Sequence, residues 1–308
     1  MKKEINYSKI SHEFKEKEIS KLIKWNEPLM NHTSLKIGGP ADIFCSPNTI
    51  EELVTTISIC QDNHLPFYII GNGTNLLVLD KGIRGMVIKL GEGFKKISFH
   101  QENVRVGAGV SVQYLSILTA DQGLNGLEFA INIPGTIGGC VLNNAGFNGN
   151  CLADIIESVT FLNREKRVEK KFASDLSFKY RECNLKHEGV IILEANLLLK
   201  KGDKERIQDL MKRFTQIRKE RQPVNELSAG SIFKNPEGYF AGELIEKIGA
   251  KGLTMGKAVV STKHANFIIN NGGAKATEIL WLITEIERRV EEKFNLRLER
   301  EIEIWGEE

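Results

Sequence analysis

The sequence predicts an α+β fold built from more than one domain. Helical and strand patterns mix along the 308 residues, without the regular alternation of strand and helix that a doubly wound sheet requires. Apolar residues recur with a period near 3.6 between residues 207 and 217, the spacing of an amphipathic helix. They alternate with polar residues between 296 and 305, as in a strand. A chain of this length is also long for a single core, so we expect two or three domains.

Composition and charge argue against several classes of protein. A content of 41% hydrophobic and 27% charged residues is ordinary for a soluble globular chain, and a net charge of +2 predicts neither nucleic-acid nor membrane partners. The N-terminal residues lack the apolar core of a signal peptide, and no window approaches the roughly 18 apolar residues of a membrane span. We therefore expect a cytoplasmic protein. The oligomeric state is left open, with a monomer favoured.

The cysteines and histidines do not predict a metal site. The five cysteines are odd in number and form no C-x-x-C pair, and the six histidines are dispersed. We interpret the cysteines as reduced thiols and expect no bound metal. The cysteines are Cys45, Cys60, Cys140, Cys151 and Cys183.

Before the first glycine-rich stretch, four segments have recognisable patterns. Residues 1–30 are charged and weakly patterned, which predicts peripheral helices or a loose arm. Residues 33–44 predict a short strand pair turned by a Gly-Gly-Pro sequence. A capping box, Thr49-x-x-Glu52, opens a helix that continues to about residue 60. Residues 67–70 then predict a buried strand.

A glycine-rich loop follows that strand directly. It is not a dinucleotide-binding fingerprint, because no G-x-G-x-x-G opens a long helix, and it is not a P-loop, because no Gly-Lys-Ser/Thr follows. Glycine and asparagine both tolerate positive φ, so successive N–H groups can converge on an anion. A type I′ hairpin turn is the plain alternative. The loop consists of Gly71, Asn72, Gly73, Thr74, Asn75 and Leu76.

A second glycine-rich loop follows the mostly apolar residues 129–133. Its small side chains let a backbone approach a flat or phosphorylated ligand closely. On its own, a Gly-Gly pair more often marks a tight turn. Together with residues 71–76, however, it predicts two halves of a cradle for a diphosphate-bearing cofactor. The candidate cofactor residues are Pro134, Gly135, Thr136, Gly138 and Gly139, with Asn144 in the Asn-Asn-Ala-Gly sequence that follows.

The remaining elements are predicted from periodicity and turn residues. A composition shift at residues 200–203 indicates a domain boundary. Before the boundary we expect strands over 86–90, 97–99, 104–106, 159–162, 168–172 and 190–199, and a helix over 112–120. After it we expect helices over 204–221, 244–248 and 279–290, and strands over 259–260, 267–269 and 296–305.

Three further sites carry side chains that could do chemistry. They are the Tyr180-Arg181 pair, Ser231 in the small-residue loop 228–236, and Glu301 on the polar face of the last strand. Each has a plain alternative, because exposed charge and turn hydroxyls are the default. Arg181 would be a surface salt-bridge partner, Ser231 a turn or capping residue, and Glu301 one carboxylate in a solvated row. The residues alone predict a cofactor-binding enzyme of unknown chemistry.

Longer motifs point to one family. In order along the chain they are IGGPADIF, GNGTNLLV, EFAINIPGTIGG, NNAG, YRE, AGSIFKNP, LIEKIGAKG, KHANFIIN and LERE followed by Ile302. From about residue 31 to the C-terminus the chain resembles the UDP-N-acetylenolpyruvoylglucosamine reductases, or UDP-N-acetylmuramate dehydrogenases, flavoenzymes of peptidoglycan precursor synthesis. The resemblance implies non-covalent FAD in a domain of the vanillyl-alcohol oxidase/p-cresol methylhydroxylase type over 31–201, with lobes of about 31–70 and 71–201. It implies a substrate-binding domain over 202–308, with 1–30 as an arm.

The resemblance also implies residue roles. NADPH reduces the flavin, and UDP-N-acetylglucosamine enolpyruvate then receives the hydride at C3. Residues 71–76 and 134–139 would hold the FAD diphosphate and the isoalloxazine edge. Arg181 would neutralise the substrate carboxylate, Glu301 would stabilise an enol form, and Ser231 would give a proton to C2. The residues expected near the substrate are Tyr180, Lys234 and Asn235. A Gly135→Val change is expected to displace the flavin.

The chain departs from the family pattern in places. Phe147-Asn148-Gly149 stands where many relatives carry Ala-Tyr-Gly, Leu253 where an aromatic is frequent, and Lys257 where a glycine is frequent. The short stretch 181–190 lacks the inserted tyrosine loop of the longer family type, so we expect the shorter type. Another FAD-dependent oxidase or dehydrogenase of the same superfamily would explain the cradle but not AGSIFKNP. A non-enzymatic nucleotide-sugar binding module would explain only the C-terminal part.

Overall fold

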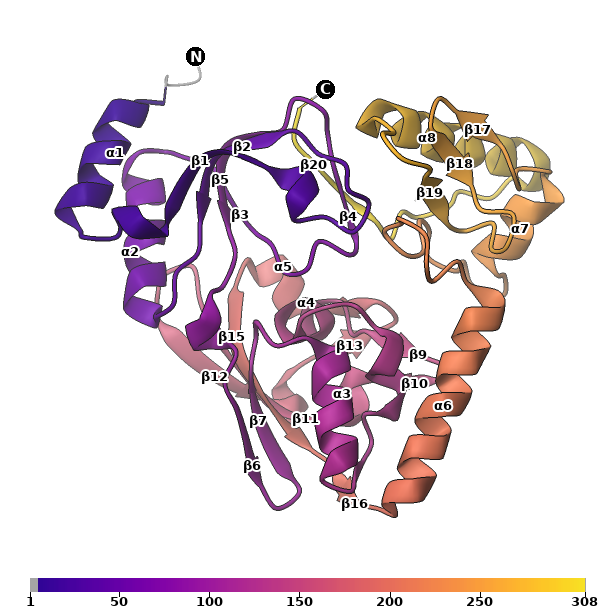
Figure 1. The fold of residues 1–308 in the computed structure, drawn as a ribbon, viewed down its shortest axis with the longest axis horizontal. Helices are drawn as coiled ribbons and strands as arrows, with labels where there is room; N and C mark the ends of the chain where they lie inside the picture. The colour runs from indigo at the N-terminus through magenta and orange to yellow at the C-terminus, as the bar shows by residue number, and fades with distance from the viewer. Residues whose placement is uncertain (1–4, 308) are drawn as a thin grey trace. The chain divides into compact units, whose positions relative to one another are not determined.

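A computed structural model describes residues 5–307 of the chain (Figure 1). Its contacts divide it into two compact units, each drawn from separated stretches of sequence. Unit 1 comprises the described part of 1–23 together with 45–71 and 88–217. Unit 2 comprises 24–44, 72–87 and the described part of 218–308. The domain limits 1–30, 31–201 and 202–308 stay a prediction.

A five-stranded antiparallel sheet lies at the centre of unit 1. Its order is β12-β11-β15-β7-β6, and each neighbouring pair is antiparallel. The two predicted hairpins are confirmed, and the predicted long strand is the middle strand of the sheet. The strands are β6 (Ile97–His100), β7 (Asn103–Gly107), β11 (Ile156–Leu162), β12 (Val168–Phe172) and β15 (Ile191–Leu198). Short strand pairs complete the unit: β8 (Leu124–Asn125) with β16 (Lys200–Lys201), β9 (Gly146–Phe147) with β10 (Asn150–Cys151), and β13 (Phe178–Lys179) with β14 (Glu182–Cys183).

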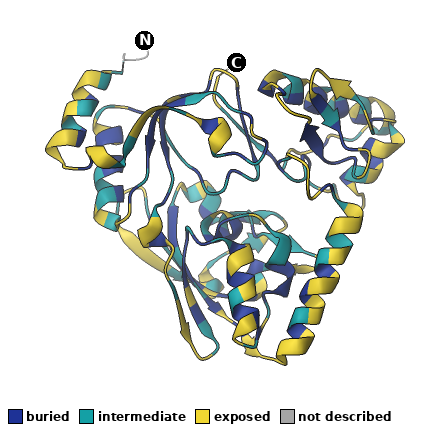
Figure 2. Ribbon diagram, viewed as in Figure 1, coloured by how far each residue is buried: buried dark blue, intermediate teal, exposed yellow. Residues whose placement is uncertain are grey.

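Two helices of unit 1, α2 and α6, begin at capping side chains that the sequence predicts. The Thr49 hydroxyl accepts from the N–H of Glu52 at 3.1 Å, and Asp203 Oδ1 accepts from the N–H of Arg206 at 2.9 Å. The second of these opens the long helix α6, which buries Ile207, Met211 and Phe214 and exposes much of its other face (Figure 2). The helices are α1 (Tyr7–Glu16), α2 (Ile50–Asp62), α3 (Val112–Asp121), α4 (Ile137–Leu142), α5 (Leu185–Glu188) and α6 (Lys204–Arg221), whose last turn is counted with unit 2.

Unit 2 joins the C-terminal residues to two earlier stretches of chain. β4 (Leu76–Val78) pairs in parallel with β20 (Glu303–Trp305), so the strand that follows the first glycine-rich loop is bonded to the last strand of the protein. One hydrophobic core runs from Leu35 and Leu77 to the buried face of α8. The other strands of unit 2 are β1 (Ile23–Pro28), β2 (Pro40–Cys45), β5 (Ile83–Ile88), β17 (Thr254–Met255), β18 (Ala258–Val260) and β19 (Ile268–Asn270), and its helices are α7 (Ala241–Lys247) and α8 (Ala276–Phe294). The short strand β3 (Phe67–Ile69) is counted with unit 1.

Four predictions of secondary structure are wrong. Residues 33–37 form a loop, because the Thr33 hydroxyl donates to the carbonyl of Ile37 at 2.8 Å and folds the chain on itself. Part of the predicted arm is β1, a strand of a sheet. The second glycine-rich loop becomes a helix at Ile137, whose N–H donates to Val110 at 2.9 Å. The final strand covers only 303–305, because its partner β4 is itself three residues long.

The predicted α+β class is confirmed by this mixture of helices and mainly antiparallel strands. Within residues 5–307, no helix combines the length and the apolar character that crossing a membrane requires. All five cysteines are free thiols. Burial raises the pKa of Cys45 to about 11 and the pKa of Cys60 and Cys140 to about 12, so these three stay protonated at neutral pH.

Candidate functional site

The first glycine-rich loop requires glycine at its centre. Gly73 has φ of +59°, and a Cβ atom there would overlap the carbonyl oxygen of His32. The N–H of Ser34 donates to the carbonyl of Gly73 at 3.0 Å. The segment 32–34 therefore packs against the backbone of this loop. Asn72, Gly73, Thr74, Asn75 and Leu76 all belong to unit 2.

Hydrogen bonds tie this loop to the segments that carry Ser231 and Glu301, all within unit 2. The Ser34 hydroxyl donates to the carbonyl of Ser228 at 2.7 Å. The side-chain amide of Asn75 donates to the carbonyl of Glu301 at 2.8 Å, and the carbonyl of Asn75 accepts from the N–H of Glu303 at 3.1 Å. The predicted cofactor loop and two predicted catalytic residues thus belong to one bonded framework.

The segment that begins at Ser231 is bonded to the chain around residues 300–301. The carbonyl of Ile232 accepts from the N–H of Glu301 at 2.8 Å, and the backbones of Phe233 and Arg300 form an isolated antiparallel β-bridge. Both Ser231 and Glu301 are half-buried, whereas the side chain of Glu299 is 72% exposed. The carboxylates 299 and 301 therefore differ in environment, which weighs against a uniform solvated row.

The two residues after Phe233 have bonds of their own. The ammonium of Lys234 lies 2.5 Å from a carboxylate oxygen of Glu299. The side-chain carbonyl of Asn235 accepts from the N–H of Ala241 at 3.0 Å, at the first turn of α7. These bonds give each residue a structural role. Their contact with substrate stays a prediction.

The second glycine-rich loop belongs to unit 1, with Gly71. Its backbone is fixed by the N–H of Val112, which donates to the carbonyl of Gly135 at 3.1 Å. Thr136 is 6% exposed, and a Cβ at Gly71 would lie 2.6 Å from its hydroxyl. The structure therefore brings the first residue of one predicted loop into contact with the middle of the other. Gly138 packs closely as well, because a Cβ there would lie 3.2 Å from that of Ala108.

Gly139 and Gly135 differ in the space around them. A Cβ at Gly139 would meet only the Thr136 hydroxyl, 3.7 Å away, and Gly139 is exposed. This bare backbone beside a hydroxyl fits a ligand such as FAD. At Gly135, by contrast, a Cβ would lie 2.7 Å from the buried Cys140 sulfur. A side chain added at Gly135 would therefore collide with the protein itself. The displacement of flavin by Gly135→Val stays a prediction.

A pair of variants separates these two effects. Gly139→Val is expected to lose bound flavin and to keep the thermal midpoint of the flavin-free wild-type protein, because its side chain occupies open space. Gly135→Val is expected to lower the midpoint, because overpacking at a buried contact typically costs about 1–3 kcal/mol. Flavin absorbance per protein and thermal unfolding check both. A Gly139→Val protein that retains a full complement of flavin would contradict the cradle.

Asn144 holds backbone on both sides. Its amide nitrogen donates to the carbonyl of Lys179 at 3.0 Å, and its amide oxygen accepts from the N–H of Ala153 at 3.1 Å. The side chain is 7% exposed, and the residue has φ of +38°. Asn144 therefore supports the hairpin that presents residues 180 and 181. A direct contact with a cofactor stays a prediction.

Arg181 lies at the turn of the β13–β14 hairpin. It has φ of +58°, and its guanidinium donates to the carbonyl of Gly146 at 3.2 Å. The guanidinium carbon lies 5.5 Å from the ring centre of Tyr180, within the range of a cation–π contact. Arg181 is half-buried, whereas Tyr180 is 55% exposed. The turn thus presents a fixed cation beside an accessible aromatic ring.

One residue of the framework had no predicted role. Asn266 is 3% exposed and makes three hydrogen bonds to Ile232 and Phe233. The signal in the sequence is an amide within the apolar run 265–269, where a buried polar side chain must have partners.

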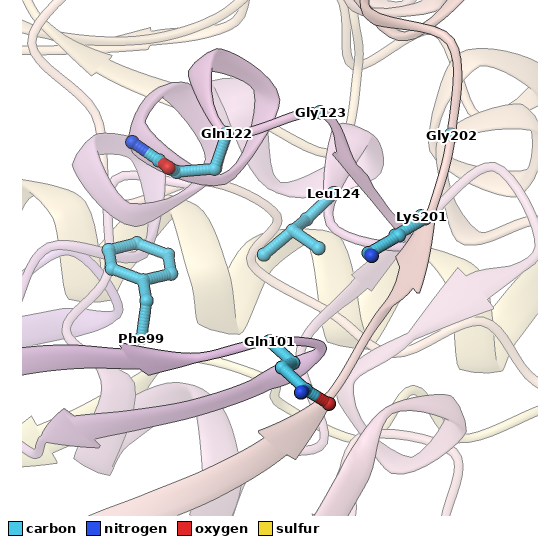
Figure 3. A pocket seen from close by; sticks show the side chains of 7 residues that line it. All are labelled: Phe99, Gln101, Gln122, Gly123, Leu124, Lys201 and Gly202. Atoms are coloured by element: carbon cyan, nitrogen blue, oxygen red, sulfur yellow. The ribbon is translucent and has the colours of Figure 1, made fainter.

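A pocket of about 380 Å³ lies elsewhere in unit 1 (Figure 3). It opens between the β6–β7 turn, the end of α3 and β16. No predicted site residue is among the residues that line it, which are Phe99, Gln101, Gln122, Gly123, Leu124, Lys201 and Gly202. Among residues 5–307, no group of three or more His, Cys, Asp or Glu side chains is arranged to hold a metal ion.

Two family models and several relatives match most of the chain. The C-terminal domain of UDP-N-acetylenolpyruvoylglucosamine reductase matches residues 222–305, and an FAD binding domain matches residues 41–169. The enzyme of that name from Alkaliphilus oremlandii is 44% identical over 287 residues, 93% of this chain and 94% of its own. The one from Bacillus subtilis is 41% identical over 299 residues, 97% and 98% of the two chains. The crystal structure of the reductase from Thermus caldophilus matches with a TM-score of 0.79 and 36% identity, covering 92% of this chain and 98% of that one.

Proposed function

Because the chain belongs to the UDP-N-acetylenolpyruvoylglucosamine reductase family, we propose that this enzyme reduces UDP-N-acetylglucosamine enolpyruvate to UDP-N-acetylmuramate with NADPH and FAD. The product is a precursor of peptidoglycan. The observation that carries the proposal is the framework in unit 2, where hydrogen bonds join the 72–76 loop to the segments of Ser231 and Glu301. A loop fit for a phosphate group and two candidate catalytic residues are thereby held together.

The glycine-rich loops would hold FAD without a covalent bond. The N–H groups of residues 71–76 would face its diphosphate, and the bare backbone around Gly139 would lie against the isoalloxazine edge. FAD, when bound, would supply the hydride chemistry that links NADPH to C3 of the enolpyruvyl group. The 41–169 match to an FAD binding domain supports this assignment.

Residues of the chain would stabilise the negative charge that forms on the substrate and would donate a proton to it. Hydride arrival at C3 leaves negative charge at C2, which spreads into the substrate carboxylate. The Arg181 guanidinium would neutralise that carboxylate, and Glu301 would stabilise the enol form by a hydrogen bond. Ser231 would then give its proton to C2, which completes the reduction. A hydroxyl is a weak acid, but protonation of a carbanion-like carbon runs steeply downhill.

Tyr180, Lys234 and Asn235 would contact the rest of the substrate. Lys234 is a point charge suited to a diphosphate, and its pairing with Glu299 keeps the ammonium in place until a ligand competes for it. Tyr180 is exposed enough to stack on a ring. A cytoplasmic location and a monomeric state remain predictions of the sequence.

The absorption spectrum of the purified protein tests the cofactor assignment. We expect a yellow protein that releases intact FAD on acid or heat denaturation, because neither glycine-rich loop offers a histidine or cysteine for attachment. NADPH should reduce the flavin once, and its continued consumption should require the enolpyruvyl sugar. Flavin left on the denatured chain would contradict non-covalent binding. A colourless protein would indicate a sugar-binding module, and a flavoprotein without response to NADPH would indicate an oxidase.

A further inference from the structure

We propose that Asn266 is a positioning residue that fixes Ser231 for proton transfer through the two residues that follow it. The inference rests on the proposed role of Ser231 as the proton donor. Asn266 lies just before β19, far from Ser231 in sequence, and would itself touch neither the substrate nor the cofactor.

Asn266 forms hydrogen bonds with the backbone polar groups of the two residues that follow Ser231. Its amide oxygen accepts from the N–H of Phe233 at 2.9 Å, and its amide nitrogen donates to the carbonyl of Phe233 at 2.8 Å. Its own carbonyl accepts from the N–H of Ile232 at 2.9 Å. A carboxamide with this orientation therefore replaces a neighbouring strand, in a place where Asn266 is 3% and Phe233 1% exposed.

The hydrogen bonds from Asn266 to Ile232 and Phe233, which we call the Asn266 clamp, restrain the chain directly after Ser231. On the other side of Ser231, Gly230 has φ of +77°, and its backbone is the least restricted of any residue type. The chain that follows is held by Asn266 on one side and by Glu301, whose N–H donates to Ile232, on the other. Orientation of a proton donor is sensitive, since a displacement of about 1 Å can cost roughly 10²-fold in rate. Loosening Phe233 should therefore misplace the Ser231 hydroxyl.

Asn266→Asp tests the clamp with hardly any change of shape. The replacement turns the donor that faces the carbonyl of Phe233 into a carboxyl oxygen. When protonated, that carboxyl can still donate; when ionised, it faces the carbonyl oxygen with negative charge. Burial raises the pKa of such a carboxyl, so the change falls within a usable pH range. The variant should thus lose function as pH rises and recover it as pH falls.

Asn270→Asp is the matched control. Asn270 is 4% exposed, and its amide is bonded just as fully, but to different segments. Its nitrogen donates to the carbonyl of Leu35 at 2.8 Å, and its oxygen accepts from the N–H groups of Gly272 and Ala274 at 3.0 and 2.9 Å. A loss of general stability should therefore be similar in the two variants, whereas misplacement of Ser231 should occur in only one.

Stopped-flow measurement of the two half-reactions across pH distinguishes a general loss of stability from misplacement of Ser231. We expect both holoenzyme variants to be reduced by NADPH at near-wild-type rates. Reoxidation by the enolpyruvyl sugar should be about 10²-fold slower for Asn266→Asp at high pH, with recovery at low pH, and nearly unchanged for Asn270→Asp. In the flavin-free protein, amide exchange at Ile232 and Phe233 should rise only in Asn266→Asp.

Three results would overturn the inference. Equal slowing of reoxidation in the two variants would show a general structural effect, and equal slowing of both half-reactions in Asn266→Asp would place Asn266 in support of the flavin site. Failure of the sugar to reoxidise the wild-type flavin would overturn the proposed function and this role with it. That last outcome is distinguishable, because it concerns the unaltered chain.

Discussion

Ser231→Ala is expected to leave flavin reduction by NADPH near the wild-type rate and to slow reoxidation by the enolpyruvyl sugar severely. Hydride transfer from NADPH to flavin needs no proton at C2, so the hydroxyl has no part in the first half-reaction. General acids contribute roughly 10²–10⁴-fold, and the loss will exceed this range if water cannot reach C2. Stopped-flow traces of the two half-reactions measure both effects.

The same variant should bind substrate almost normally, because a hydroxyl used in the transition state contributes little to ground-state binding. Ser231→Cys should retain more activity than Ser231→Ala, since a thiol is a stronger acid of similar reach. Equal slowing of both half-reactions by Ser231→Ala would mean that Ser231 shapes the flavin site, and the proton donor would have to be another group.

Glu301→Ala is expected to lower turnover by roughly 10²–10³-fold, the scale for removal of one electrostatic partner of a transition state. The backbone of Glu301 should stay in place, because it is bonded at both ends: its N–H to Ile232 and its carbonyl to Asn75. Steady-state turnover with NADPH and the enolpyruvyl sugar measures the effect.

Two neighbouring carboxylates serve as controls, but they are not equivalent. Glu303→Ala changes only a side chain of β20 and should reduce turnover little. Glu299→Ala also releases Lys234 from its 2.5 Å ion pair, so a change in the KM for the sugar is expected there. The pair itself is largely exposed on the Glu299 side and should contribute at most about 1 kcal/mol to folding. Similar losses in all three variants would favour a solvated row over a catalytic Glu301.

Elements with a strong local pattern could be predicted from the sequence. The apolar residues of α8 repeat at helical spacing, and Ile279, Ile283, Ile286 and Val290 are fully buried as expected. Predictions failed where the partner lies far away in sequence. β20 is short because it pairs with β4, more than 200 residues earlier, and no periodicity within 296–305 contains that information.

In the candidate site, too, local residue patterns could be predicted and long-range contacts could not. The residue types of the loops 71–76 and 134–139 predicted a cofactor cradle, and the structure adds the contact between Gly71 and Thr136. The bond from the Asn144 amide to the carbonyl of Lys179 was not predictable, because tertiary folding brings that backbone group near from 35 residues away. Asn266 was missed for that reason: its partners, Ile232 and Phe233, lie over 30 residues away.

We propose that this protein transfers hydride from NADPH, through its flavin, to an enolpyruvyl sugar. The most direct measurement is an anaerobic single turnover followed by absorbance at the flavin band, with mass analysis of the product. We expect NADPH to bleach the flavin, UDP-N-acetylglucosamine enolpyruvate to restore its colour, and the sugar product to be two hydrogens heavier than the substrate. UDP-N-acetylglucosamine, which lacks the enolpyruvyl group, should not restore the colour. A flavin that stays bleached with the enolpyruvyl sugar, or that both sugars reoxidise alike, would contradict the claim.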